Sequence, residues 1–422
     1  MFPDVTMPGV DVILPDNVWL KERGADIVGL IVTHGHEDHL GGVTHLLREF
    51  EVPLYGSELT MGLARHKVKE ARLESRTSFR VLSDGDRIDI GPFDVEVLPI
   101  THSVPQSLCV VLHTDHGVIV HTGDFKLDPD PIDGRLTAMD RLAEIQQETG
   151  VRLLMADSTN ADKPGWSPSE STIGETFKRL FPGWRGRRLI VSCFASHLHR
   201  VQQICDVAIN EGRTVFPLGR SMVNNVRIAK ELGVLDLPDR SVDSIDRLND
   251  YAPEDVCVIC TGSQGETNAA LSLLARGDHP DFSLTSSDVV LLSSHPIPGN
   301  ELPVYRVINR LTRIGCEVVH DGYEHVHTTG HAQREELDHL YQTLLPEWYV
   351  PIEGEHRMLR RNADVAIEAG HVAGRTVVAS DGDQLVLGSE GLKISGRIPA
   401  PYRYIDGLLD DLSPELLEDR RK

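Results

Sequence analysis

The sequence contains few cysteines, no long hydrophobic run and fewer basic than acidic residues. No apolar stretch approaches the roughly 20 residues that span a bilayer as a helix. The opening, MFPDVTMPGVDVILPD, lacks the basic start and apolar segment of a secretory leader. The six cysteines are spread thinly and stand mostly in apolar runs, as reduced thiols do. We therefore expect a cytoplasmic globular protein without a membrane partner.

The charge balance limits how this chain can bind nucleic acid. Its 64 acidic and 42 basic residues give a net charge of −22, which argues against a general attraction to a polyanion. A nucleic-acid interface would need a local basic channel, for which residues 178–189 and 197–203 are candidates. The first stretch fits a solvated face at least as well. His197 and His199 in the second fit either a phosphate contact or a helix cap.

Apolar, β-branched runs alternate with helix-like segments along the whole chain, which is the pattern of an α/β protein. Most runs end in His, Asp, Ser, Thr or Gly, and open α/β sheets place their sites at such strand ends. A chain of 422 residues exceeds the roughly 250–300 that one core holds, so we expect two domains. A connector rich in Pro, Gly and Ser occupies residues 160–170, and a return point is expected near residues 323–331.

The segment IVTHGHEDHLGG, residues 31–42, has the composition of a metal site. His34 and His36 are two apart, so in an extended segment both imidazoles point to one side and can bind one ion. Asp38 and His39 on the following turn can reach a second ion. The segment therefore predicts two adjacent metal sites.

Two further donors at strand ends could complete these sites: His102 in PITHSVPQS and Asp124 in HTGDFKLD, the latter able to lie between the ions. Imidazole and carboxylate ligands favour Zn²⁺, with Mn²⁺ as the alternative because carboxylate oxygen also suits harder ions. Two such ions about 3.5–4 Å apart activate water and hold the attacking and leaving oxygens of a phosphodiester. The donor set therefore predicts a hydrolase.

Several motifs, in this order, resemble a known family. THGHEDHLGG, THSVPQS and HTGDFKLD resemble motifs of the metallo-β-lactamase fold, and ADSTNAD, HTTGHAQREEL and PIEGEHRML resemble the later motifs of its β-CASP branch. LGRSM, CTGSQGE and SHPIPGNE resemble the ribonuclease J family. The resemblance covers essentially the whole chain. It implies a metallo-β-lactamase αββα sandwich, residues 1–172 and 321–422, with an inserted β-CASP α/β domain, residues 173–320.

The resemblance also implies a role for each matching residue. One zinc would be held by His34, His36 and His102, and the other by Asp38, His39 and Asp124, with Asp124 bridging. Asp157 would orient a ligand, and His331 would protonate the leaving oxygen. The RNA phosphates would follow Arg220, Ser221, Ser263, Gln264, His327, Thr328, Thr329 and Gly330. The implied activity is 5′-to-3′ exonucleolytic and endonucleolytic cleavage of single-stranded RNA with a 5′ monophosphate, in the maturation and decay of RNA, including rRNA.

The chain departs from the family pattern in two places. Glu353 in PIEGE stands where the family has a histidine, so its carboxylate either binds metal or hydrogen-bonds the metal ligands. Initial strands with an Asp-Ala-Gly motif and a small C-terminal domain are missing. Either Met1 is an internal methionine of a longer frame or the protein is shortened. We expect a monomer or homodimer, with other RNA-decay proteins as further partners.

Two other functions compete with this one. The same metal centre could hydrolyse a different substrate, although an inserted unit after residue 160 is not needed for a small one. The chain could instead be a truncated RNA-binding paralogue without activity, but a protein freed from catalysis has no evident reason to keep every ligand.

Overall fold

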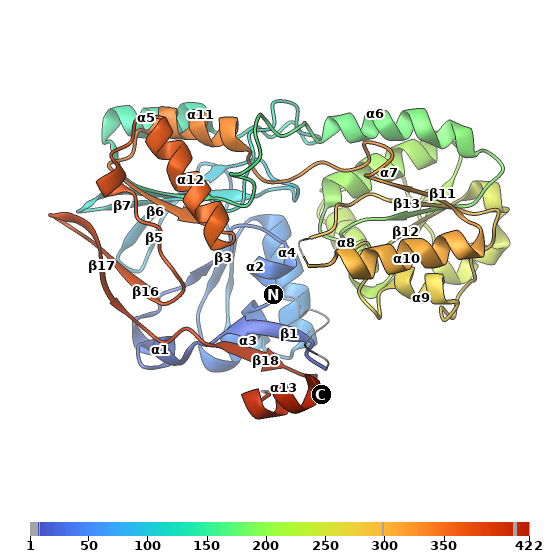
Figure 1. The fold of residues 1–422 in the computed structure, drawn as a ribbon, viewed down its shortest axis with the longest axis horizontal. Coiled ribbons are helices and arrows are strands. Elements are labelled where there is room, and N and C mark those ends of the chain that lie inside the picture. The colour runs from blue at the N-terminus through green and yellow to red at the C-terminus, as the bar shows by residue number, and fades with distance from the viewer. Residues whose placement is uncertain (1–6, 8, 298, 408–411, 422) are drawn as a thin grey trace.

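The chain folds into two lobes that lie side by side, each built around its own sheet structure (Figure 1). The computed structural model describes residues 7, 9–297, 299–407 and 412–421. Residues 9–157 and 334–407 build the first lobe, whereas residues 171–320 build the second. Within the described ranges, no helix is long and apolar enough to cross a bilayer.

The first lobe contains two sheets that pack face to face. The larger one has the order β15 (Trp348–Ile352), β9 (Val151–Asp157), β8 (Gly117–His121), β7 (Leu108–Thr114), β6 (Phe93–Pro99) and β5 (Arg87–Ile90). The smaller, parallel sheet has the order β2 (Leu30–Ile31), β3 (Leu54–Gly56) and β4 (Phe79–Val81). Val95 and Val97 of β6 pack with Ile31 of β2 and Tyr55 of β3, so apolar side chains fill the space between the sheets.

Helices cover the outer faces of both sheets. Against the larger sheet lie α5 (Met139–Glu148), α11 (Arg334–Leu344) and α12 (His356–Glu368). Against the smaller one lie α3 (Val43–Glu49) and α4 (Glu58–Glu70), while the short α1 (Val18–Lys21) and α2 (Glu37–Leu40) flank β2 in the chain. Four layers result, helix, sheet, sheet and helix, which confirms the predicted αββα sandwich.

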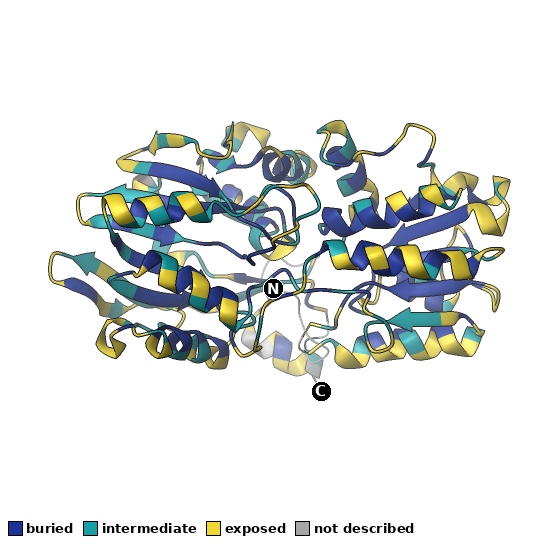
Figure 2. Ribbon diagram, turned by 90° about the horizontal axis from the view of Figure 1, so that it is seen from above, coloured by how far each residue is buried: buried dark blue, intermediate teal, exposed yellow. Residues whose placement is uncertain are grey.

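The second lobe is a parallel sheet with the order β11 (Thr214–Leu218), β12 (Val256–Cys260), β10 (Leu189–Ser192), β13 (Val289–Leu292) and β14 (Glu317–His320). Alternate residues face opposite sides, because a strand has a period of two. Leu189 and Val191 pack against α6 (Ser171–Leu180), α7 (Leu198–Asn210) and α8 (Arg220–Glu231). Ile190 packs against α9 (Ala270–Arg276) and α10 (Glu301–Ile314). In Figure 2 the strands of this sheet other than β14 are largely buried, and the helices around them carry both buried and exposed residues.

The segments near the two ends of the described chain lie side by side on the first lobe. β1 (Val12–Pro15) pairs antiparallel with β18 (Tyr402–Ile405), next to α13 (Pro414–Arg421). The hairpin of β16 (Asp383–Gly388) and β17 (Gly391–Arg397) packs Leu385 and Leu392 against β15 and β9. Residues far apart in sequence therefore close the same lobe.

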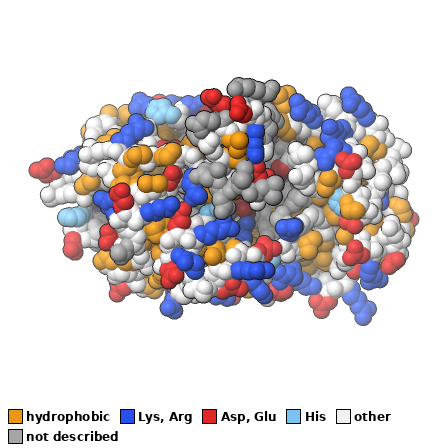
Figure 3. Space-filling model, turned by 90° about the horizontal axis from the view of Figure 1, so that it is seen from below, with side chains coloured by type: hydrophobic (Ala, Val, Ile, Leu, Met, Phe, Trp, Pro, Cys, Tyr) orange, Lys and Arg blue, Asp and Glu red, His pale blue; other side chains and the backbone are white. Residues whose placement is uncertain are grey.

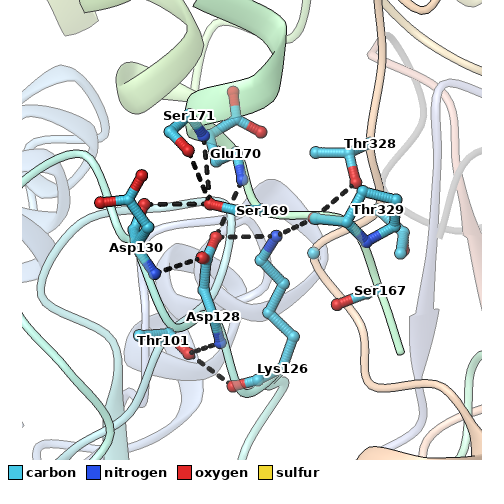
Figure 4. Close-up of polar contacts among 12 residues, drawn as sticks. Thr101, Lys126, Asp128, Asp130, Ser167, Ser169, Glu170, Ser171, Thr328 and Thr329 are labelled. Carbon is cyan, nitrogen blue, oxygen red and sulfur yellow. Dashed lines mark hydrogen bonds and ion pairs between the residues drawn. The ribbon is translucent and has the colours of Figure 1, made fainter. Parts of the chain in front are cut away.

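Two segments, residues 158–170 and 321–333, connect the lobes, and a buried polar network joins them to the first lobe (Figure 4). The Lys126 ammonium donates to the carbonyl of Pro168 at 2.9 Å and pairs with Asp128 at 3.0 Å. Thr328 of the second segment donates to the same carbonyl at 2.9 Å. The backbone N–H of Glu170 donates to Asp128 at 2.9 Å. These bonds hold both connecting segments in one place relative to the first lobe.

The lobes also meet through α4 and α8. Gly62 on α4 lies so close to α8 that a Cβ atom there would be 2.8 Å from Leu232. The apolar core of the smaller sheet continues across this contact into the second lobe. The relative position of the two lobes is therefore fixed by apolar packing as well as by the connecting segments.

Candidate metal centre

The predicted donors come from loops that follow four different strands. His34, His36, Asp38 and His39 follow β2, His102 follows β6, Asp124 follows β8 and Asp157 ends β9. The loops meet at one end of the two-sheet sandwich, where strand ends leave side chains free to point into a common space. His331 reaches the same space from the second connecting segment.

His34, His36, His102 and Asp124 form one group, with donor atoms all within 4.8 Å of one another. The His102 Nε2 atom lies 3.0 Å from His36 Nδ1 and 3.9 Å from an Asp124 carboxylate oxygen. The same oxygen lies 3.6 Å from His34 Nε2. Three imidazoles and one carboxylate oxygen around a shared space are a suitable ligand set for a divalent metal.

Asp38, His39 and Asp124 form the second group, also within 4.8 Å. His39 Nε2 lies 3.2 Å from Asp124 and 3.8 Å from Asp38. Both Asp38 and His39 lie on the single turn α2, which begins directly after His36. Asp124 belongs to both groups and can therefore contact two neighbouring ions.

Unpaired polar atoms show that this set of residues fits a metal. His34 Nε2 and Asp124 Oδ1 are buried and have no hydrogen-bond partner among the described residues. Such atoms are costly unless a ligand satisfies them. The Nδ1 atom of His102 is 2.6 Å from the carbonyl of Gly330, to which it can donate. That bond would leave the lone pair of His102 Nε2 free to face the other donor atoms of the first group, as in metal-binding histidines.

The local electrostatics keep the imidazoles of the first group neutral, the form that binds metal. Burial, with the neighbouring imidazoles, lowers the pKa of His34 and of His102 well below the ordinary value. Burial also lowers the pKa of His36 to about 4. Burial would raise the pKa of Asp124, but the hydrogen bond from His39 and the surrounding histidines hold it well below its usual range. The first group therefore offers neutral nitrogens together with the ionised carboxylate of Asp124, which both groups share.

His331 and Asp157 form an ion pair beside the metal ligands. The His331 Nδ1 atom is 2.7 Å from the Asp157 carboxylate, which is buried. Burial alone would lower the pKa of His331, but Asp157 outweighs it and raises this pKa to about 9. The backbone N–H and hydroxyl of Thr159 both donate to Asp157, at 2.9 and 2.7 Å. Asp157 is thus held in place to orient a protonated His331.

Comparison with known proteins supports this picture. The metallo-beta-lactamase superfamily matches residues 8–163, and the family described as Ribonuclease J, beta-CASP domain, matches residues 186–311. Ribonuclease J of Mycolicibacterium smegmatis is 42% identical over 410 residues, 97% of this chain and 73% of the relative. Ribonuclease J of Thermus thermophilus is 40% identical, over 100% and 74% of the two chains. This chain belongs to the ribonuclease J family.

A solved structure agrees on the fold. The crystal structure of a protein of unknown function from Enterococcus faecalis V583 matches with a TM-score of 0.54 and 18% identity, over 77% of this chain and 75% of that chain. Family membership and the histidine–aspartate cluster together identify this chain as a metal-dependent ribonuclease with a metallo-β-lactamase fold. The expected family, fold and enzyme class are confirmed.

Glu353, which replaces the histidine of the family pattern, follows β15 at the edge of the centre. It is exposed, and none of the groups of close donor atoms in the described residues includes it. The desolvation of its carboxyl by surrounding protein, and then the charge of Asp124, raise its pKa to about 7. Its role as a ligand stays a prediction.

The residues predicted along an RNA path fall into two sets. Arg220 and Ser221 are exposed at the start of α8, directly after Gly219, whose φ is +95°. The second set, Ser263 and Gln264, is buried. The Gln264 side chain donates to the His295 carbonyl at 2.8 Å.

The motif HTTG at residues 327–330 also makes internal contacts. His327 is partly exposed, and Thr328 binds the first connecting segment. The Thr329 hydroxyl accepts from Asn160 at 2.7 Å, and the Gly330 carbonyl accepts from His102. A Cβ atom on Gly330 would lie 2.8 Å from His102 Cε1. In this structure the motif therefore positions the metal centre and the connecting segments, and its contact with RNA stays a prediction.

Sequence reasoning missed several residues that orient the ligands. The Thr33 hydroxyl is 3.0 Å from His34 Nδ1, and the Ser103 hydroxyl is 3.1 Å from His36 Nε2. Their only signal in the sequence was their position next to a predicted ligand.

His197 and His199 are both buried: His197 lies 3.4 Å from Glu170, and His199 lies 3.2 Å from Asp133 of the first lobe. His197 makes no helix-capping bond.

A small pocket lies between the lobes beside the metal centre. It is lined on one side by residues of the first lobe, among them His102 and Gln106. Glu170 and His199 line it from the other side. The metal centre is therefore next to a junction between the lobes.

Proposed function

We propose that this enzyme holds two zinc ions and hydrolyses single-stranded RNA from a 5′ monophosphate, with additional endonucleolytic cleavage, in the maturation and decay of RNA. Asp124 supports this proposal most directly, because this one carboxylate belongs to both groups of donors. Imidazole-rich ligation favours Zn²⁺, and Mn²⁺ is the alternative. A cytoplasmic monomer or homodimer, with RNA-decay proteins as partners, completes the proposal.

In this proposal His34, His36 and His102 hold one ion, and Asp38, His39 and Asp124 hold the other, with Asp124 between them. Bound metal would supply Lewis acidity and activate water for attack on phosphorus. The chain itself fixes the ligands: the Gly330 carbonyl orients His102, and the turn α2 places Asp38 beside His39. Glu353 would either bind the second ion or hydrogen-bond its ligands.

His331 is the proposed general acid. Its Nδ1 atom faces Asp157, so its Nε2 atom is the one left to donate a proton. As the bond between phosphorus and the leaving 3′ oxygen breaks, that proton passes to the oxygen. A pKa of about 9 keeps His331 protonated at neutral pH. Asp157 acts through His331 and positions it.

The RNA would approach through the junction between the lobes. Arg220 and Ser221, exposed at the start of α8, are the predicted RNA residues best placed for phosphate contact. The second set, Ser263, Gln264 and residues 327–330, would shape the path through their backbone groups and their packing.

The test compares Asp38→Ala with the adjacent Glu37→Ala, which removes an exposed carboxylate that pairs with Lys67 instead of facing the centre. Zinc and manganese are measured by elemental analysis, and decay is followed for RNAs with a 5′ monophosphate or a 5′ triphosphate. We expect two metal ions and rapid decay of the monophosphate RNA in the wild type and in Glu37→Ala. Asp38→Ala should lose one ion and most of the activity. Equal activity of the two variants, or a wild type inactive on RNA when loaded with metal, would overturn the proposal.

A further inference from the structure

Helix α10 carries a row of exposed arginines on the side that faces away from the sheet. Val304, Val307 and Leu311 pack into the second lobe. Arg306, Arg310 and Arg313, spaced by four and three residues, share the opposite, exposed face. We call these three residues the arginine stripe.

The arginine stripe is not neutralised by neighbouring acids. Within the part of the chain that the structure describes, none of its three guanidinium groups has an ion-pair or hydrogen-bond partner. The only acid on α10 is Glu301, its first residue, which lies on a different side of the helix. By contrast, Arg227 on α8 pairs with Glu231 at 2.9 Å. In a chain with 64 acidic and 42 basic residues, an acid-free basic face is unusual.

Apolar and aromatic side chains lie at the end of α10 that is nearer the junction of the lobes. Ile297, Leu302 and Tyr305 are 43%, 64% and 53% exposed. Exposed aromatic rings beside arginines provide stacking surfaces for the bases of single-stranded nucleic acid. Figure 3 views the molecule from below, and over the second lobe it shows basic side chains interspersed with apolar ones and with some acidic ones.

The start of α10 is joined to the loop that contains the predicted RNA residues Ser263 and Gln264. The Gln264 side chain accepts from the Ile297 N–H at 2.7 Å and donates to the His295 carbonyl at 2.8 Å. Gly265 lies so close to Pro303 that a Cβ atom would be 2.5 Å from its carbonyl carbon. From there α10 runs away from the junction (Figure 1). The arginine stripe therefore continues outward from the expected RNA path.

At its far end the arginine stripe borders an open hollow between α9 and α10. The hollow is lined by Arg276, Arg310 and Arg313, and Asp278 is the acidic residue of its lining. Asp278 is paired with Arg276 at 2.8 Å, which leaves the other two arginines unpaired. Positive charge thus extends from the middle of α10 to its end.

We propose that the arginine stripe, with Tyr305, binds the phosphates and bases of single-stranded RNA that extends beyond the active site. The proposal rests on the function proposed above and adds a second RNA contact, outside the metal centre. The distance from Arg306 to Arg313 along the helix is about 10 Å, at about 1.5 Å per residue. A row of this length can contact successive phosphates of one strand. Because the row is positively charged, the ligand that fits it is a polyanion.

The expected effect follows from counterion release. Each phosphate contact with a single strand contributes about 0.7 to the slope of log affinity against log salt, so losing three contacts should reduce the slope by about 2. At about 0.15 M salt the same loss corresponds to a decrease in affinity of roughly tenfold or more.

The experiment uses the metal-loaded full chain and a variant with Arg306→Gln, Arg310→Gln and Arg313→Gln. A matched control removes three exposed charges of the first lobe that have no partner in its described part: Lys69→Gln, Arg80→Gln and Lys393→Gln. Decay is measured for 5′-monophosphorylated RNAs of about 6 and about 30 nucleotides, of which the longer one covers more than an OB-fold-sized site. RNA affinity is measured separately by fluorescence anisotropy over a range of salt concentrations.

We expect the stripe variant to retain the wild-type kcat on both RNAs, with KM raised roughly tenfold for the long RNA alone. Its anisotropy slope should fall by about 2 relative to the wild type and the control. An unchanged slope and KM would overturn the proposal and point to an acidic protein partner or a solvated face. Anisotropy needs no turnover, so a wild type that binds RNA through the stripe without cleaving it would refute the proposed function alone.

Discussion

Replacing Arg200 with methionine is expected to destabilise the second lobe by about 3–5 kcal/mol, the cost of leaving a buried charge unpaired. The Arg200 side chain is fully buried. It donates to both carboxylate oxygens of Glu170, at 2.6 and 2.8 Å. It also donates to the Ser293 hydroxyl at 2.6 Å and to the Val326 carbonyl at 3.0 Å. Arg200 therefore joins both connecting segments to the end of β13.

The magnitude follows from what the substitution leaves behind. Methionine fills a similar volume but donates no hydrogen bond. Among the described residues, the Glu170 carboxylate then keeps the bond from Gln203 at 2.8 Å and the contact with His197 alone. Ser293 still donates to Val326 at 2.6 Å, so that part of the site survives. Most of the loss should therefore come from the buried carboxylate of Glu170.

A double-mutant cycle isolates the pair. Glu170→Gln, Arg200→Met and the double variant are unfolded in urea, with the fluorescence of the buried Trp184 as a reporter of the second lobe. We expect the double variant to lose about 2–3 kcal/mol less than the sum of the single losses. Arg227→Met removes an exposed pair on α8 and should change the free energy of unfolding by less than about 0.5 kcal/mol.

The pH dependence gives an independent check. Burial would raise the pKa of Glu170, but Arg200 and His197 hold it well below the ordinary value. A lowered folded-state pKa gives stability that is present above the unfolded pKa, near 4.3, and is lost as pH falls through the folded pKa. The difference between wild type and Glu170→Gln should thus be constant from about pH 6 to 8 and shrink only in acid. Losses that simply add in the cycle, or an Arg200→Met cost below about 1 kcal/mol, would refute the reasoning.

Three further predictions concern the metal centre. Gly330→Ala places a Cβ atom 2.8 Å from His102 Cε1 and should weaken metal affinity roughly 10–100-fold by titration, whereas Gly183→Ala, with no atom near its Cβ, should not. His331→Ala should lower kcat on RNA by about 10²–10⁴-fold with metal content unchanged by elemental analysis; lost metal would instead make His331 a ligand. Chelation should abolish RNA decay and lower the melting temperature, and added Zn²⁺ should restore both; a melting temperature indifferent to metal would contradict the site.

Much of the architecture could be predicted from the sequence because its signals are local. The alternation of apolar runs and helical segments indicated an α/β protein, and strands and helices do alternate along the structure. His34 and His36 stand two apart before a one-turn helix, so their proximity follows from local geometry. His102 and Asp124 were predicted ligands because they end strands, and the structure brings both to the same group.

Other features depended on contacts between residues far apart in the chain. Gly330 was predicted to contact phosphate, yet its carbonyl lies 228 residues away in sequence from the imidazole that it orients. The burial of Gln264 and Thr328 likewise depends on packing between segments that no local pattern relates.

The sequence by itself determined the donor types and their order along the chain, since ligand chemistry and strand ends are written in short motifs. Only the tertiary structure decided that the two groups of predicted metal ligands share Asp124 and that Arg200 is buried between both connecting segments. It also decided that the arginines of α10 face solvent without acidic partners among the described residues. Distances and burial arise when lobes and loops pack together, and one-dimensional spacing does not encode them.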